Sequence, residues 1–310
     1  MRPLPGPFRV RYDRYMSQPS LATTTRKSDE RTRVIVLGSG DRLPIREQAE
    51  ALRPVIARHA DIVLWDLAYT EPLENVAADL VIVFGGDGSI LRAAHQMGYR
   101  QLPVVAVNLG KLGFLADLSS EQFLDVLPQI CRGEYRVVEH LMFECTIERD
   151  RQVLSRHLGL NDVALLAGAP FAILDIHLYV DAELVTTYSC DGLIVSTPVG
   201  STAHSLSAGG PILRKDLQAF VVLALSPHTL TNRPVVDGAE RRYEMVVPRP
   251  HEGTSVVVDG RVVHKLVAGD RVRVERAEPC FKLVEVSGHG YYRTLREKLG
   301  WGGQLHPGDI

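Results

Sequence analysis

The stretch "VIVFGGDGSIL" (residues 81–91) most constrains what this chain can fold into. An apolar run typical of a buried strand ends there in Gly85, Gly86 and Gly88, and apolar residues at helical spacing follow directly. A strand that passes through glycines into a helix is typical of parallel sheets, in which ligands bind beyond the carboxyl ends of the strands. The glycines allow close approach of the backbone to a ligand, and an acid, Asp87, stands among them.

A carboxylate in a glycine-rich bend has two interpretations. Asp-Gly is common in tight turns, where it needs no further role. The glycine N–H groups and the start of the next helix would instead suit a phosphate, but a carboxylate repels phosphate. On this second interpretation Asp87 holds Mg²⁺ or takes a proton from an attacking hydroxyl, and either role indicates phosphoryl transfer.

The same alternation of strand and helix patterns extends over residues 33–135. Strand-like runs lie at 33–40, 61–67, 78–86 and 102–110, and helical spacing at 44–59, 89–98 and 119–133. Pro54 predicts a kink or an early end of the first helix, Gly98 closes the second, and Ser119 or Ser120 caps the third. These residues are therefore expected to form an α/β domain with a parallel sheet.

The pattern changes after residue 135. Short runs of alternating or β-branched residues lie at 140–149, 175–185, 219–228, 243–249, 254–261 and 270–277, with glycines, prolines and Asp-Gly turns between them. This arrangement predicts a β-rich, mainly antiparallel domain over residues 136–275. A short helix is expected near the end of the last segment, residues 276–310.

Composition excludes several classes of protein. With 310 residues the chain can form two domains, and its net charge of −2 gives no sign of a nucleic-acid-binding protein. No apolar run approaches the roughly 18 residues of a membrane span. The four cysteines form no C-x-x-C pair, so a zinc knuckle or disulfide framework is not expected. A reducing compartment, the cytoplasm, fits best.

The first 32 residues differ from the rest. They are rich in proline, threonine, serine and arginine and lack hydrophobic periodicity, so we expect a mobile arm. They contain no continuous apolar segment of the secretory kind. Their excess of basic residues leaves an organelle transit peptide as an alternative, and Met16 is an alternative start.

A second unusual block, "DGLIVSTPVGSTAHSLSAGGPI", spans residues 191–212. A strand leads there into a dense set of glycines and hydroxyl residues, which is costly to order. The block is either a flexible loop or a polar surface that binds sugar hydroxyls and phosphates. No Walker motif is present, and Leu43 and Leu91 replace the third glycine of two incomplete dinucleotide fingerprints. A Walker-type NTPase and a dehydrogenase are therefore disfavoured.

Together these motifs resemble the bacterial type of the NAD kinase family. The matching stretches are residues 85–88, 108–118, 160–162, 191–212, 226–236, 258–261 and 295–301. They occur in the family's order. The Gly-Gly-Asp-Gly element alone is shared with diacylglycerol and sphingosine kinases and with phosphofructokinases, whereas the block at 191–212 is far more specific.

The resemblance implies a fold and an activity. The fold would be the NAD kinase-like pair of domains, with residues 276–310 returning to the first domain. The reaction would transfer the γ-phosphoryl group of ATP, or of polyphosphate, to the adenosine ribose 2′-hydroxyl of NAD, giving NADP. ATP with Mg²⁺ and the substrate NAD are the small molecules implied, and a homodimer or homotetramer is expected.

The resemblance also assigns residues. Asp87 would be the base, Phe114 would line the adenine side, Asn161 and Asp162 would hold the NAD sugars or the nicotinamide end, and Asp191 would contact NAD. No protein residue is assigned to a metal. The positions implied in nucleotide binding are Gly85, Gly86, Gly88, Phe114, Asn161, Asp162, Asp191, Val199, Thr202, Ala203, His204, Ser207 and Arg261.

Four residues depart from the family's pattern. Asp162 stands for the usual Glu, Val199 for Thr or Ser, His204 for Tyr, and His140 for a common Arg. His204 either fills the tyrosine's space or makes ligand contact depend on pH near neutrality. The departures leave a non-catalytic NAD(P) sensor as an alternative to a kinase acting on NAD. The shared glycine motif leaves a second alternative, a kinase acting on a lipid or sugar, and the block at 191–212 argues against it.

Overall fold

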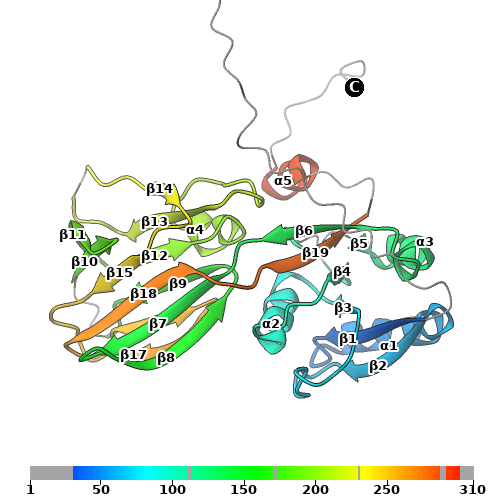
Figure 1. Ribbon diagram of the computed structural model, residues 1–310. Helices are drawn as coiled ribbons and strands as arrows, with labels where there is room; N and C mark the ends of the chain where they lie inside the picture. The colour runs from blue at the N-terminus through cyan, green and yellow to red at the C-terminus, as the bar shows by residue number, and fades with distance from the viewer. Residues whose placement is uncertain are drawn as a thin grey trace, which may run out of the picture.

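The computed structural model describes residues 31–110, 113–116, 118–169, 173–229, 231–286 and 291–300. The expected N-terminal arm lies almost wholly outside this range. The described chain forms an α/β body and a β-rich body side by side (Figure 1). This agrees with the two-domain architecture predicted from the sequence.

The first domain is built on one mixed sheet. Its strand order is β2-β1-β3-β4-β19-β6, with β5 beside β4. Neighbouring strands are parallel except β6, which pairs antiparallel to β19. The strands are β1 (Thr32–Gly38), β2 (Ala60–Asp66), β3 (Leu80–Phe84), β4 (Val104–Asn108), β5 (Leu118–Ser119), β6 (Arg136–His140) and β19 (Phe281–Glu285).

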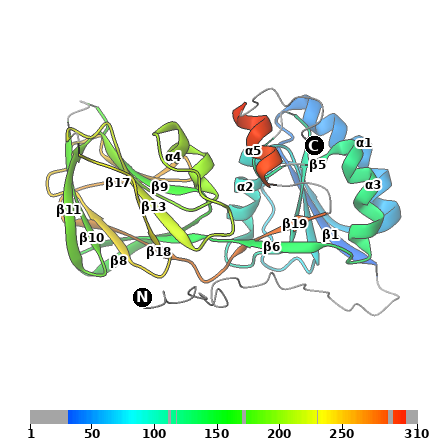
Figure 2. The ribbon, with the colours of Figure 1, turned by 90° about the horizontal axis from the view of Figure 1, so that it is seen from above.

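Helices cover both faces of this sheet. They are α1 (Leu43–His59), α2 (Asp87–Met97), α3 (Ser120–Cys131) and α5 (Tyr291–Leu299). The apolar residues of α1 and α3 form one core cluster with the sheet, and those of α2 form another. Figure 2 shows α1 and α3 on the outer side, whereas α2 and α5 face the second domain. The helix that carries Asp87 therefore lies at the junction of the domains.

Two of the helix boundaries predicted from local sequence are confirmed, and one is wrong. Gly98 ends α2 with a φ of 55°, and Ser119 caps α3 through a capping box with Gln122. The early end predicted at Pro54 is wrong, because α1 continues to His59. The missing Pro54 N–H would have bonded the carbonyl of Glu50, and Glu50 is exposed, so water can satisfy that carbonyl.

The second domain is a sandwich of two sheets, ordered β11-β10-β15-β18-β7-β8 and β14-β13-β12-β9-β16-β17. Every strand pair described within these sheets is antiparallel, as predicted. The strands are β7 (Phe143–Arg149), β8 (Gln152–Gly159), β9 (Asp162–Leu166), β10 (Leu174–Val180), β11 (Glu183–Cys190), β12 (Gly192–Ser196), β13 (Ala219–Leu225), β14 (Val235–Gly238), β15 (Tyr243–Val246), β16 (Ser255–Val258), β17 (Arg261–Lys265) and β18 (Asp270–Arg276).

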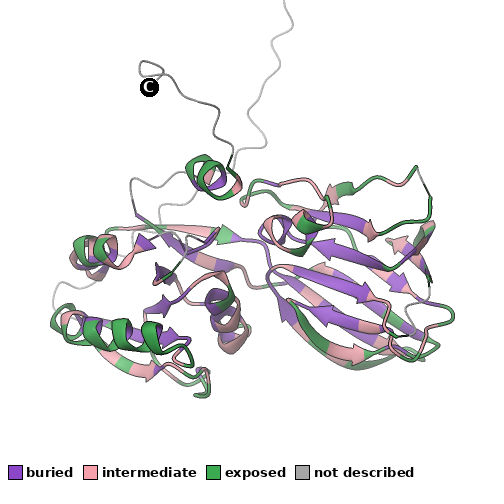
Figure 3. Ribbon diagram, turned by 180° about the vertical axis from the view of Figure 1, so that it is seen from behind, coloured by how far each residue is buried: buried purple, intermediate pink, exposed green. Residues whose placement is uncertain are grey.

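Apolar side chains from both sheets meet inside the sandwich. Phe143 and Val272 come from one sheet, Val195 and Phe220 from the other, and all are buried. The rings of Phe220 and Tyr243 meet edge to face at a centroid distance of 5.6 Å. Figure 3 shows the buried residues running through the strands of both domains.

The chain crosses between the domains twice. β6 covers residues 136–140, which the sequence division assigns to the second domain, yet it lies in the first sheet beside β19. β19 follows β18 of the sandwich and lies between β4 and β6. The two crossings are therefore β6 to β7 and β18 to β19, and they run next to each other (Figure 1).

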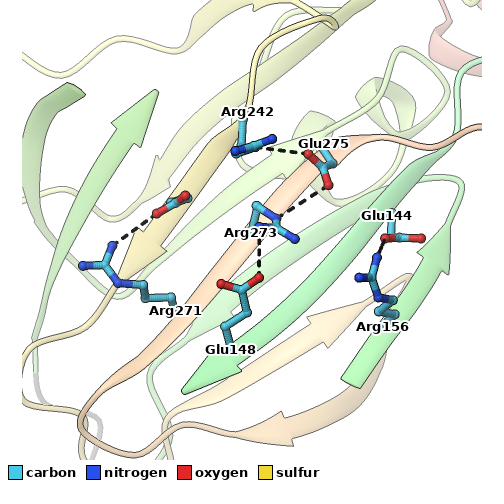
Figure 4. Close-up of polar contacts among 8 residues, drawn as sticks. Glu144, Glu148, Arg156, Arg242, Arg271, Arg273 and Glu275 are labelled. Carbon is cyan, nitrogen blue, oxygen red and sulfur yellow. Dashed lines mark hydrogen bonds and ion pairs between the residues drawn. The ribbon is translucent and has the colours of Figure 1, made fainter. Parts of the chain in front are cut away.

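The outer face of the strands β15, β18, β7 and β8 carries ion pairs, all of which join neighbouring strands or their ends except one pair within β18 (Figure 4). The pairs are Arg242–Glu275, Arg273–Glu275, Arg273–Glu148, Arg271–Glu244 and Arg156–Glu144, with N–O distances from 2.6 to 3.6 Å. Charged side chains alternate here with inward apolar ones, as expected of strands with one solvated face.

These ion pairs differ in burial, so they should differ in their effect on stability. The Arg273 side chain is 19% exposed and bridges two glutamates, whereas that of Arg271 is 52% exposed. We expect Arg273→Ala to lower the free energy of unfolding by about 1–2 kcal/mol, and Arg271→Ala by less than about 0.5 kcal/mol. Urea unfolding measures both, and equal losses would contradict the argument from burial.

Candidate active site

Asp87 stands where β3 ends and α2 begins. Gly86 is the N-cap, so Asp87 is the first helical residue. Its carboxylate turns toward the segment 113–116: Oδ2 accepts the N–H of Phe114 at 2.8 Å, and Oδ1 accepts those of Leu115 at 2.8 Å and Ala116 at 3.2 Å. A carboxylate oxygen can accept about two hydrogen bonds. Oδ2 accepts only one hydrogen bond from the described residues, so it can accept one more.

The glycines around Asp87 serve two purposes. A Cβ on Gly85, whose φ is 140°, would lie 2.1 Å from the Ser89 hydroxyl oxygen, and one on Gly113 would lie 2.2 Å from Asp87 Oδ1. At Gly86 and Gly88 a Cβ would meet no described atom within 4 Å. The first two glycines thus allow tight packing behind the bend, and the other two leave its front open.

The front of the bend can receive an anion. The first N–H groups of a helix have no acceptor within it, and here they belong to Asp87 and its neighbours at the start of α2. The helix dipole adds partial positive charge at the same place. A phosphate can therefore lie against the open glycines while the Asp87 carboxylate is held to one side by the segment 113–116.

A second aspartate, which the sequence analysis missed, orders the loop beside α2. Asp66 accepts the N–H groups of Ala68, Thr70 and Glu71 and the side-chain amide of Gln96, at 2.8 to 2.9 Å. Burial would raise the pKa of Asp66, but these hydrogen bonds outweigh it and lower the pKa. The loop's Tyr69 hydroxyl in turn donates to the Ser89 carbonyl at 3.0 Å.

The second domain contributes the turn at residues 160–162 and the loop after β12. These two segments are packed as one unit. Thr197 donates its N–H to the Asn161 carbonyl at 2.9 Å and its hydroxyl to the Leu160 carbonyl at 2.6 Å. A Cβ on Gly200 would lie 2.0 Å from the Asn161 carbonyl oxygen. The pairing of β9 with β12 also places Asp162 opposite Ser196.

The hydroxyl groups of the loop mostly bind the loop itself. Ser201 donates to the Pro198 carbonyl at 2.6 Å and accepts the N–H of Leu213 at 3.0 Å, and Thr202 donates to the Val199 carbonyl at 2.9 Å. The loop forms a short 3₁₀-helix, η1 (Gly200–Thr202), and a single helical turn, α4 (His204–Ser207). Several hydroxyls of the block therefore satisfy carbonyl groups of the protein, and a ligand-binding surface stays a prediction for the groups of the block that remain accessible.

A third aspartate, also missed from the sequence, joins the domains. The Asp259 side chain is fully buried. Its Oδ2 accepts the N–H of Leu160 at 2.8 Å and contacts His95 Nε2 at 2.9 Å, while its Oδ1 accepts the N–H groups of Asn161 at 2.7 Å and Asp162 at 3.1 Å. The Asp-Gly pair at 259–260 was visible as a turn, but nothing local indicates its partner on α2.

Asp162 is a buried acid next to Asp259. Burial away from water, and secondly the negative charge of Asp259, raise the pKa of Asp162 from 3.8 to about 7. Near neutral pH the group is therefore divided between its protonated and charged forms. A residue expected to hold NAD thus titrates close to neutral pH.

The structure separates Asp191 from the other predicted residues. Asp191 precedes β12, whereas Thr202, Ala203, His204 and Ser207 follow it. Five strand residues lie between the two ends, which is about 16 Å. Within one chain Asp191 is thus remote from the loop after β12, and its side chain is exposed.

Two of the unusual residues lie in the protein interior. Val199 is 3% exposed and belongs to the apolar cluster that contains Ile90 and Ala93 of α2, so its side chain cannot line a ligand surface. His140 is buried and stacks on Phe281 at 6.4 Å. Burial, and secondly the charge of Lys215, lower the pKa of His140 to about 4. Its ring is therefore neutral at neutral pH.

The remaining predicted residues are accessible. His204, Ser207 and Arg261 are exposed, and Phe114 and Asn161 are half-buried. Phe114 adjoins Asp87, because its N–H donates to the carboxylate. Within the described ranges no three His, Cys, Asp or Glu side chains gather as metal ligands, and no helix has the length and apolar character needed to cross a bilayer.

Two family models match the chain. The ATP-NAD kinase N-terminal domain matches residues 16–135, and the ATP-NAD kinase C-terminal domain matches residues 160–286. A curated NAD kinase of Rhodopirellula baltica is 55% identical over 273 residues, which are 88% of each chain. An NAD kinase of Geobacter sp. (strain M21) is 41% identical over 226 residues, which are 73% of this chain and 78% of the relative.

Two solved structures resemble the fold. The yeast NADH kinase complexed with NADH has a TM-score of 0.80 at 20% identity, covering 90% of this chain and 91% of that one, and supports the fold alone. An NAD kinase from Archaeoglobus fulgidus in complex with ATP has a TM-score of 0.67 at 28% identity, covering 87% of this chain and all of that one.

The raised pKa of Asp162 predicts a pH-dependent stability difference. The unfolded carboxyl has a pKa near 4 and the folded one about 7. The folded state therefore binds the extra proton in this window, and this group's contribution to stability falls as pH rises. The variant Asp162→Asn does not titrate, so its unfolding free energy relative to wild type should rise by about 1–3 kcal/mol between pH 5 and 8. Urea titrations at several pH values measure this, and a constant difference would contradict the burial argument.

Proposed function

The chain belongs to the ATP–NAD kinase family and acts as an NAD kinase, and from this premise we propose that Asp87 is the catalytic base. The proton it takes belongs to the adenosine ribose 2′-hydroxyl of NAD. The supporting observation is the geometry of the carboxylate: three backbone N–H groups hold it, and Oδ2 keeps one acceptor direction for a hydroxyl.

The reaction then follows from this arrangement. A ribose hydroxyl is a poor nucleophile until its proton is removed as the new bond forms. The 2′-oxygen bonds to the γ-phosphorus of ATP, the bond from that phosphorus to the bridging oxygen breaks, and ADP leaves. The proton moves to Oδ2 of Asp87. The N–H groups of the segment 113–116 orient the carboxylate throughout.

The glycine bend holds the phosphates of the donor. Its open front at Gly86 and Gly88 and the start of α2 suit the γ-phosphoryl group, whose transfer depends on positioning and charge neutralisation more than on covalent chemistry. Mg²⁺ enters with ATP and neutralises phosphate charge. The ribose hydroxyl takes the one open acceptor direction of Asp87 Oδ2. The ion would therefore be held by the phosphates of ATP.

NAD lies across the junction of the domains. The turn 160–162 and the exposed residues after β12, His204 and Ser207, face the sugars, and Phe114 lies on the adenine side next to Asp87. Arg261, at the same end of its sheet as the turn 160–162, contacts the dinucleotide there, and Asp191, at the other end of β12, contacts a part remote from the loop after β12.

The working protein is a cytoplasmic homodimer or homotetramer. The apolar side chains of Leu184 and Val185 on β11 are more than half exposed, which favours their burial between subunits. All four cysteines are free thiols, which fits a reducing compartment.

The assignment of Asp87 predicts a selective loss of turnover. We expect Asp87→Asn to lower kcat for NADP formation by about 10²–10⁴, because general-base catalysis contributes that much, while the dissociation constant for NAD stays within about threefold of wild type. A coupled assay with an NADP-specific dehydrogenase measures the first and calorimetry the second.

The same assay distinguishes an NAD kinase from the alternative functions. Wild type should form NADP only when NAD, ATP and Mg²⁺ are all present. Near-normal turnover of Asp87→Asn would overturn the role given to this residue. NAD binding without turnover in wild type would favour a sensor, and neither binding nor turnover would favour a lipid or sugar kinase.

A further inference from the structure

Helix α2 carries a second polar residue that reaches out of its own domain. His95 lies two turns beyond Asp87, and its Nε2 contacts Oδ2 of Asp259 at 2.9 Å, across 164 positions of sequence. The His95 side chain is 21% exposed and that of Asp259 is fully buried. This contact joins the helix that carries the base to the second domain.

The Asp259 carboxylate is saturated by its four partners. Oδ2 accepts from Leu160 and His95, and Oδ1 accepts from Asn161 and Asp162. Two acceptor directions on each oxygen are then used, so the group has none left for a substrate. Hydrogen bonds to an ionised carboxylate are roughly twice as strong as neutral ones. Asp259 is therefore a joint between backbone segments, and His95 is its only partner on α2.

The joint links two parts of the site. One end of α2 holds Asp87, and His95 lies about 12 Å along the same rigid helix. On the other side of Asp259 is the turn 160–162, which carries Asn161 and Asp162. We propose that His95 is a positioning residue whose hydrogen bond to Asp259 sets where this turn holds NAD relative to Asp87. This inference rests on the function proposed above.

Apolar packing cannot supply the same precision. Leu160 and Val199 pack with Ala93 and Ala94 of α2 in one buried cluster, and such contact is non-directional. A hydrogen bond has a narrow range of length and angle. Both the neutral ring with its proton on Nε2 and the charged ring donate from Nε2, so the joint does not require a charged His95.

The histidine His157, whose pKa depends partly on His95, provides a control. His157 on β8 contacts the Ser155 hydroxyl at 2.9 Å, and His264 on β17 contacts Asp270 at 2.9 Å. Burial, and then the positive charges of His264 and His95, lower the pKa of His157. His157 thus shares the surroundings of His95, but its side-chain bond stays within its own strand.

The test compares two amides of different reach at position 95. The Gln amide nitrogen extends about as far as Nε2 of histidine, and the Asn amide only about as far as Nδ1. We expect His95→Gln to keep kcat/KM for NAD within about threefold of wild type. His95→Asn and His95→Ala should lose at least about tenfold, because small misplacement of reacting groups is costly. His157→Ala should stay within about twofold.

The kinetics are measured at 20 °C beside thermal unfolding of each variant. Equal activity of His95→Gln and His95→Asn would overturn the inference, because the two amides differ in reach and little else. A loss in His157→Ala as large as in His95→Ala would also overturn it, since that would mean general disturbance of the junction. The role of Asp87 is tested separately: should Asp87→Asn stay active, the base assignment fails, while the Gln–Asn comparison still reports on NAD placement.

Discussion

The apolar cluster shared by the two domains is the interaction on which the site depends. Side chains of α2, such as Ile90 and Ala93, are buried there together with Leu160 and Val199 of the second domain. Burial of this surface holds the domains together, but it does not define their relative position to within a fraction of an ångström. That precision comes from the buried Asp259 carboxylate, whose hydrogen bonds to His95 and to the turn 160–162 have defined directions.

Three aspartates order the site in the same way and differ in one respect. Asp66, Asp87 and Asp259 each accept three backbone N–H groups from a loop that they hold in place. Asp66 accepts a fourth bond from Gln96, and Asp259 one from His95. Among the described residues Asp87 has no such fourth partner. The same local chemistry thus yields two structural groups with four partners each and one acid with three, which leaves Asp87 Oδ2 an acceptor direction.

The sequence allowed prediction of what short segments decide. The glycine bend before α2, the end at Gly98 and the cap at Ser119 depend on neighbouring residues, and the structure contains all three. Long-range partners were not predictable in detail. The family resemblance implied that residues 276–310 return to the first domain, but not that β19 lies between β4 and β6, nor that Asp259 meets His95 across 164 positions. The sequence shows that the loop after β12 is rich in hydroxyl groups. It does not show which carbonyl groups they bond, because those carbonyls come near only in the folded chain.

The four departures from the family pattern form two pairs, one of packing residues and one of residues that offer a polar or titratable group. Val199 fills the cluster between the domains, and His140 is a neutral ring stacked on Phe281, so both change packing and neither alters the chemistry offered to a ligand. His204 is exposed on α4, and burial raises the pKa of Asp162, in the turn 160–162, to about 7. The case for a non-catalytic sensor drew on all four departures. It now rests on two, and neither of these touches Asp87, the glycine bend, or the N–H groups that hold the Asp87 carboxylate.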